Sequence, residues 1–237
     1  MRLPITTVSA AALLAAGATA AVAQSDEPMA ISSWNYDALY QMRGLRGEEL
    51  LDAEVYDATG EEVGEVENVV IEDDRIVAIV AEVGGFWDMG DSHVVVPWDQ
   101  LEFADGGIVI PVNEDNVEEY DAFAEGSIVG GSLDQIEVAD DGDVAVMASA
   151  YRLTDLLDDY ATADGIGYGY VDDVIFSEDG SLEAVVVTSR GGYYAYPYYG
   201  PGYGYSPYGS TYELGYEATE LEEMEEFDYA AGDWDWW

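Results

Sequence analysis

The 237-residue chain repeats part of its own sequence, and this repeat sets its architecture. Residues 50–71 and residues 156–176 both open with Leu-Leu-Asp and run through a glycine, Gly64 or Gly169, into an apolar stretch. After an acidic turn the similarity continues, and residues 76–80 correspond to residues 182–186. Self-similarity at a long, fixed spacing is typical of repeated structural units. We therefore expect two small domains in tandem.

Each unit has the pattern of a β-meander. In the first unit, β-branched runs cover residues 66–71, 76–83, 93–96 and 108–112, and Gly, Asp and Asn separate them. Such runs favour strands. Gly64 and Gly169 fall where a turn enters a strand, a place that often needs a positive φ or a close backbone approach. Residues 113–120 and 219–224 predict short helices with acidic first turns. The predicted fold class is all-β, with a few short helices.

The first 23 residues have the pattern of a secretory signal. They carry one arginine and an Ala- and Leu-rich apolar run, and they end in Ala21-Val22-Ala23 before Gln24. Small residues at these positions are typical of a signal-peptidase site. We expect cleavage after Ala23 and a periplasmic or secreted product. The alternative is an uncleaved anchor, but no later window reaches the roughly 18 apolar residues that span a bilayer. The mature chain is expected to lack a stable membrane span.

Composition shifts then divide the chain. We expect a signal peptide at 1–23, an N-terminal extension at 24–37, a first domain at 38–125 and a linker at 126–149. A second domain at 150–229 contains a Tyr/Gly/Pro-rich loop at 193–209, and an acidic, aromatic tail follows at 230–237. The linker is rich in Gly, Ser and Asp with isolated Ile and Val, so we expect it to contain a little strand.

The charge is extreme. The chain holds 51 acidic residues against six basic ones, all arginine, and its formal net charge is -45. Nucleic acid is an unsuitable partner for this negative surface. Self-repulsion destabilises a compact state unless salt screens it, and the Debye length falls to about 3 Å at 1 M. We therefore expect a halophilic source that supplies counterions. The alternative is a calcium-binding or cation-binding surface, but no segment has EF-hand spacing.

Few residues suit catalysis. The chain has no cysteine and one histidine, which excludes thiol nucleophiles, disulfides and sites that need two imidazoles. His93 is interpreted as a structural or surface residue. Adjacent carboxylates carry little information among 51 acids, and no Gly-x-Ser-x-Gly elbow is present. We predict no enzymatic activity, no cofactor and no metal.

Several motifs together indicate a family. In chain order they are Leu50-Leu51, Val55-Tyr56-Asp57, Gly60-Glu61-Glu62-Val63-Gly64-Glu65-Val66, Ile76-Val77-Ala78-Ile79-Val80, Gly84-Gly85-Phe86 and Val94-Val95-Val96-Pro97-Trp98-Asp99-Gln100-Leu101. With these features, residues 45–103 resemble the PRC-barrel family, named for the H subunit of the photosynthetic reaction centre.

The second unit, about residues 151–227, resembles a divergent copy of the same family. Residues 153–157 and 168–174 match well, but Tyr196-Pro197-Tyr198-Tyr199 stands where the first unit has Val96-Pro97-Trp98-Asp99. The resemblance implies two small, strongly bent β-barrels that serve as protein-interaction or assembly modules. It supplies no family-wide catalytic residues.

Two aromatic segments are the candidate binding sites. Eight of the sixteen residues from 193 to 208 are tyrosine, and tyrosine offers a large contact area together with a hydroxyl. The alternative is a low-complexity excursion without a function. The tail ends in Trp-Asp-Trp-Trp, which either packs back on the barrels or docks onto a partner. The predicted binding residues are Tyr194, Tyr196, Tyr198, Tyr199, Tyr203, Tyr205, Tyr208, Trp234, Trp236 and Trp237.

The favoured hypothesis is a non-enzymatic envelope protein with a protein partner or self-association. A secreted glycan-binding protein or carboxylate-dependent glycan hydrolase is one alternative, and it requires a carboxyl of raised pKa in a cleft. A divalent-cation binder is the other.

Overall fold

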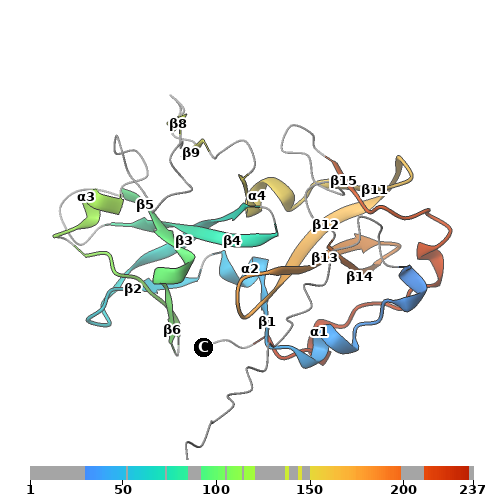
Figure 1. Ribbon diagram of the computed structural model, residues 1–237, viewed down its shortest axis with the longest axis horizontal. Helices are drawn as coiled ribbons and strands as arrows, with labels where there is room; N and C mark the ends of the chain where they lie inside the picture. The colour runs from blue at the N-terminus through green and yellow to red at the C-terminus, as the bar shows by residue number, and fades with distance from the viewer. Residues whose placement is uncertain are drawn as a thin grey trace, which may run out of the picture.

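The computed structural model describes residues 30–51, 53–72, 74–84, 92–104, 106–113, 115–120, 137–138, 144–145, 150–198 and 211–234. Figure 1 shows two β-sheet units side by side, the first in blue to green and the second in yellow to red. Strands dominate both units and the helices are short, so the predicted all-β class with two small, strongly bent, barrel-like units is confirmed. The expected signal peptide at 1–23 lies outside the described residues.

The first sheet has the order β5-β4-β3-β2-β7-β6. Its strands are β2 (Glu54–Tyr56), β3 (Glu62–Glu72), β4 (Arg75–Val83), β5 (Ser92–Pro97), β6 (Glu102–Ala104) and β7 (Gly107–Val109). The pair β2 and β7 is parallel, and the other neighbours along this order are antiparallel. The 3-10 helix η2 (Trp98–Gln100) and helix α3 (Val117–Tyr120) complete the unit. The predicted strands and the helix within 113–120 are therefore confirmed.

The second sheet has the order β14-β13-β12-β11-β15. Its strands are β11 (Tyr160–Ala163), β12 (Ile166–Ser177), β13 (Leu182–Ser189), β14 (Gly192–Pro197) and β15 (Thr211–Glu213). The pair β11 and β15 is parallel, as β2 and β7 are. The helix expected at 219–224 is the 3-10 helix η3 (Leu221–Glu223). The order β14-β13-β12-β11-β15 thus corresponds to β5-β4-β3-β2-β7 of the first sheet.

The two units exchange a strand and a short helix. Strand β1 (Gly44–Arg46) precedes the first sheet in sequence but pairs with β12 of the second, where Leu45 lies opposite Phe176. Strand β10 (Ala150–Arg152) precedes the second sheet but pairs with β3 of the first, where Tyr151 lies opposite Ile71. Helices α2 (Gly47–Leu50) and α4 (Leu153–Leu156) follow these strands. Each unit is therefore completed by a segment that the other unit contributes.

A bulge in each long strand holds the donated helix. The register shifts between Val66 and Asn68 in β3, and between Val171 and Asp173 in β12. In the second unit, Asp173 Oδ1 accepts the backbone N–H of Glu48 at 2.9 Å. In the first unit, Asn68 Oδ1 lies 3.4 Å from the N–H of Thr154, and its Nδ2 donates to Thr154 Oγ1 at 2.7 Å. These bonds satisfy helix N-termini that would otherwise lack acceptors.

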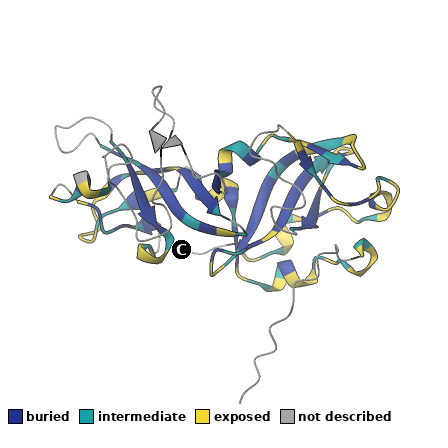
Figure 2. Ribbon diagram, turned by 45° about the horizontal axis from the view of Figure 1, so that its top comes forward, coloured by how far each residue is buried: buried dark blue, intermediate teal, exposed yellow. Residues whose placement is uncertain are grey.

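The β3–β4 and β12–β13 turns also meet. The N–H of Ile76 donates to the Gly180 carbonyl at 2.9 Å, and the N–H of Leu182 donates to the Asp74 carbonyl at 2.8 Å. Arg75 pairs with Asp179 at 3.1 Å on the surface. One continuous cluster of buried side chains runs through both units, and Figure 2 shows the buried strands of each unit in dark blue.

Gly64 and Gly169 have the role expected of a close backbone approach. A Cβ at Gly64 would overlap the carbonyl oxygen of Glu82, and one at Gly169 would overlap that of Thr188. Within the expected linker, β8 (Glu137–Val138) and β9 (Val144–Ala145) form a two-stranded sheet, which confirms the predicted strand content there. Among the described residues, no helix is long and apolar enough to cross a membrane.

Candidate functional site

The N-terminal and C-terminal segments cover the outer face of the second sheet. The 3-10 helix η1 (Ile31–Ser33) and helix α1 (Asp37–Gln41) precede β1, and the 3-10 helix η4 (Tyr229–Ala231) lies near the C-terminal end. Figure 1 shows α1 beside the red C-terminal segment. Leu39 from α1 joins Phe227 and Trp234 in an apolar cluster on the sheet. This face of the second sheet is therefore covered by the chain itself.

The predicted binding residue Trp234 belongs to this cover. Its side chain is 8% exposed, and its Nε1–H donates to the Tyr229 carbonyl at 2.6 Å. Its ring lies 6.0 Å from that of Phe227. Trp234 therefore packs back on the second sheet, which was one of the two alternatives for the tail. Trp236 and Trp237 lie outside the described residues.

The Tyr-rich segment begins as a strand. Residues 193–197 lie in β14, so the prediction that the loop starts at 193 is wrong, because these tyrosines pair with β13 as a regular edge strand. Tyr194 is 6% exposed and Tyr196 is 1% exposed, and both lie in the core. Tyr196 donates to the Tyr168 hydroxyl at 3.0 Å, and burial raises its pKa well above the usual range.

Two of the predicted tyrosines therefore fill the interior. Tyr198 is half-buried, and its hydroxyl lies 3.4 Å from that of Tyr151 on the donated strand β10. Tyr199, Tyr203, Tyr205 and Tyr208 lie outside the described residues, and their role stays a prediction.

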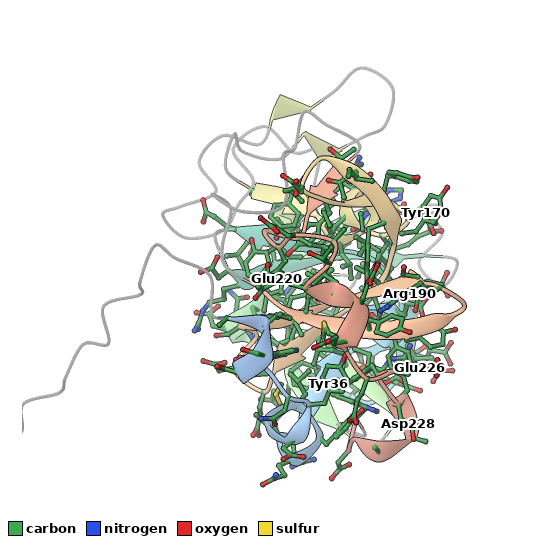
Figure 3. All side chains as sticks on the ribbon, turned by 90° about the vertical axis from the view of Figure 1, so that its right-hand side faces the viewer. Tyr36, Tyr170, Arg190, Glu220, Glu226 and Asp228 are labelled. Atoms are coloured by element: carbon green, nitrogen blue, oxygen red, sulfur yellow. The ribbon has the colours of Figure 1, made fainter. Side chains whose placement is uncertain are left out.

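An exposed aromatic patch on the β11–β12 hairpin was not predicted from the sequence. Tyr160, Ile166 and Tyr170 are 42%, 62% and 55% exposed. Tyr160 and Tyr170 are cross-strand partners, and their ring centroids lie 5.0 Å apart at 81°. Figure 3 shows Tyr170 at this end of the molecule, away from Tyr36 and Asp228. We call Tyr160 and Tyr170 the hairpin patch. Ile166 pairs with the buried Ala163 and therefore belongs to the other face of the hairpin. Tyr193, 42% exposed, is the other large hydrophobic residue exposed in the described part of the chain.

A polar cluster lies where β1 meets β12. Arg46 Nε pairs with Asp173 Oδ2 at 2.7 Å, and the guanidinium lies 4.1 Å over the Tyr229 ring. Tyr229 in turn donates to Asp172 Oδ2 at 3.1 Å. Burial raises the pKa of Asp173 to about 6, against the opposing influence of Arg46 and the Glu48 and Val174 N–H groups. Because these partners occupy both oxygens of Asp173, its role in the structure is to join the units.

A second polar cluster lies on the outer face of the first sheet. Glu67 on β3, Glu82 on β4 and His93 on β5 bring their potential ligand atoms within 4.8 Å of one another. His93 Nε2 lies 3.1 Å from Glu67 Oε2. His93, which the sequence indicated to be a structural or surface residue, lies on the surface, 30% exposed, beside a carboxylate.

Comparison with known protein families finds a match within the first unit. Residues 42–117 match the family model of the PRC-barrel domain. The match covers β1, which is donated to the second sheet, and ends before β10, which completes the first. PRC-barrel domains are typically non-catalytic modules. A search among curated proteins finds no match to the chain.

Proposed function

We propose that the chain is a non-enzymatic protein-interaction or assembly module in the envelope of a halophilic bacterium, secreted or periplasmic, with a divergent second PRC-barrel unit. The match at residues 42–117 supports the first barrel. The shared strand order supports the second. The net charge of -45 without lysine supports a saline medium, and the pattern of residues 1–23 supports export.

The hairpin patch is the observation that carries the interaction role. The antiparallel pairing of β11 and β12 places the two tyrosines opposite each other, and their rings contact edge to face. Tyrosine is enriched at interface hot spots because it buries a large ring and still satisfies its hydroxyl. A pre-positioned patch of this kind loses little side-chain entropy on docking. We propose that it contacts a protein partner or a second copy of the chain.

The proposal is tested by affinity capture with crosslinking from the envelope fraction at native salt. The parent is compared with a double variant that carries Tyr160→Ser and Tyr170→Ser. Tyr193→Ser is the matched control, because it removes an equally exposed tyrosine from another strand. We expect one defined partner, identified by mass spectrometry, that the parent and the control retain and the double variant loses. Equal loss in the control would place the interface elsewhere.

Self-association needs its own measurement. Sedimentation velocity at several protein concentrations distinguishes a monomer from a dimer that the double variant abolishes. A variant lacking residues 199–209 tests whether the predicted Tyr-rich loop contributes. If the parent is monomeric and captures no partner above background, the interaction role is rejected.

Export is tested separately. N-terminal sequencing of the protein from the native envelope or medium should read from Gln24. A protein that stays in the cytoplasm with residues 1–23 attached would contradict the proposed location.

A further inference from the structure

Three side chains on adjacent strands of the first sheet converge on one point. Glu82 and His93 are direct cross-strand partners in β4 and β5. Glu67 comes from β3, on the other side of β4. The Oε or ring-nitrogen atoms of the three lie within 4.8 Å of one another. Each residue is fixed on a strand that is hydrogen-bonded to its neighbour, so the arrangement does not depend on a loop.

The bulge in β3 brings Glu67 into this group. The register passes from Val66 opposite Ala81 to Asn68 opposite Val80, which leaves Glu67 as the extra residue. Val66 and Asn68 are buried, whereas the Glu67 side chain is 48% exposed. Bulges redirect side chains in this way next to functional sites.

At the corresponding positions of the second unit, the chain itself supplies hydrogen-bond donors to the carboxylate. The corresponding register places Asp172 in the β12 bulge and pairs Thr188 with Tyr193. Thr188 donates to Asp172 Oδ1 at 2.8 Å, and Tyr229 donates to Oδ2 at 3.1 Å. Each oxygen of this one carboxylate therefore accepts a hydrogen bond from a hydroxyl group.

The first unit has a different set of groups at this place. The carboxylate of Glu82 stands at the position that corresponds to Thr188, and the imidazole of His93 stands at the position that corresponds to Tyr193. Two carboxylates this close repel each other unless a positive charge lies between them. The overall charge of -45 increases that repulsion.

We propose that Glu67, Glu82 and His93 form a binding site for a divalent transition-metal ion of the Zn²⁺ class. An imidazole nitrogen with two carboxylate oxygens suits Zn²⁺, Co²⁺ or Cu²⁺, whereas Mg²⁺ and Ca²⁺ favour oxygen ligands alone. Three protein ligands leave a coordination position for water or a further ligand. The partial exposure of His93 and Glu67 lets solvent reach that position. The site does not depend on the proposed interaction function.

The uniqueness of His93 makes the test direct, because the chain has one histidine. The untagged chain is treated with chelator and loaded with one equivalent of Cu²⁺ in about 1 M salt, which screens diffuse binding to the acidic surface. Pulsed EPR then reports coupling to an imidazole nitrogen. We expect that coupling in the parent and its loss in His93→Gln. A parent without imidazole coupling would overturn the proposal, whatever the variants do.

Zn²⁺ calorimetry under the same conditions gives a second readout. We expect His93→Gln and Glu82→Gln each to weaken Zn²⁺ at least about 10-fold, since even the loss of a group that only supports a ligand has such an effect. Glu62→Gln is the control for Glu82→Gln, because it also removes one carboxylate from the first sheet, on the strand that carries Glu67 but outside the group. Glu62→Gln should change the affinity for Zn²⁺ less than about 2-fold, because salt screens the charge of an exposed carboxylate outside the site. Equal affinities in the parent and His93→Gln would overturn the site.

Discussion

Replacement of Asp173 by alanine should destabilise the whole chain, because this side chain joins the two units. Asp173 is fully buried on β12 of the second unit, and its partners Arg46 and Glu48 lie on the segment donated by the first. The substitution removes the 2.7 Å bond from Arg46 Nε and the 2.9 Å bond from the Glu48 N–H. It also removes the 2.8 Å bond from the Val174 N–H.

The size of the destabilisation depends on the partners that Asp173→Ala leaves without their acceptor. Removal of one member of a buried ion pair costs about 3–5 kcal/mol. Arg46 keeps its contacts with Glu48 and Glu49, at 3.1 and 2.9 Å, and its own side chain is 18% exposed. We therefore expect a value near the lower limit, about 3 kcal/mol.

The first unit supplies the matched controls. Asn68 occupies the corresponding position after the bulge as a neutral side chain, so Asn68→Ala should cost about 1–2 kcal/mol, the value of lost neutral hydrogen bonds. Asp173→Asn keeps an acceptor for the two backbone N–H groups and loses the ionic partner of Arg46. It should cost about 1.5–3 kcal/mol. Urea unfolding at a fixed, high salt concentration measures the free energy of unfolding of all three variants.

The pH dependence tests the direction of the pKa shift. Burial raises the pKa of Asp173 to about 6, above the value of about 3.9 in an unfolded chain. A folded-state pKa above the unfolded value favours the protonated form in the folded state, so this group's contribution declines as the pH rises from about 4 to about 6. The cost of Asp173→Ala should therefore be larger at pH 4 than at pH 7. A larger cost of Asp173→Ala at pH 7 would mean that the attraction of Arg46 outweighs the effect of burial on the pKa of Asp173. A cost below about 1 kcal/mol at both pH values would refute the role of Asp173 in joining the two units.

Three further outcomes are expected. The thermal midpoint should rise markedly from low salt to about 1 M salt, and a flat response would show that the acids are locally compensated. Gly64→Ala should destabilise the chain by about 1–3 kcal/mol because its Cβ would overlap the Glu82 carbonyl oxygen, whereas Glu62→Ala on the same strand should change the urea midpoint little. Fragments produced by a cut between residues 130 and 131 should regain β-structure by circular dichroism when mixed and not when separate. Separate fragments with native spectra would disprove mutual completion.

Sequence patterns predicted the strands because their local signals agree with their final environment. The β-branched run at residues 76–83 became β4, and the Gly64 position, expected to allow close approach, lies against Glu82. The tyrosines of β14 were harder to interpret. Their alternation with small residues looks like low complexity, but tyrosine also has a high strand propensity, and pairing with β13 decides between the two.

The sites were less predictable because they depend on pairing between distant residues. Tyr160 and Tyr170 meet through the register of the β11–β12 hairpin, and neither residue stands out in the sequence. Glu67 reaches His93 through the bulge in β3 and the neighbouring strand β4. With 51 acidic residues in the chain, nothing in the sequence distinguishes Glu67 and Glu82 as the ones that strand pairing brings to His93.

The strand exchange could not be inferred from the repeat, since β1 and β10 precede corresponding helices and either sheet could accept either strand. The exchange also explains where the two units differ. The joining positions keep the same geometry, with Asp173 in one unit and Asn68 in the other, because both must accept the backbone of a donated helix. The outer faces carry no such requirement. One unit's outer face is covered by α1 and the C-terminal segment, while the other's bears the His93 group. A joined pair of similar barrels can therefore diverge on its outer surfaces while its shared core stays the same.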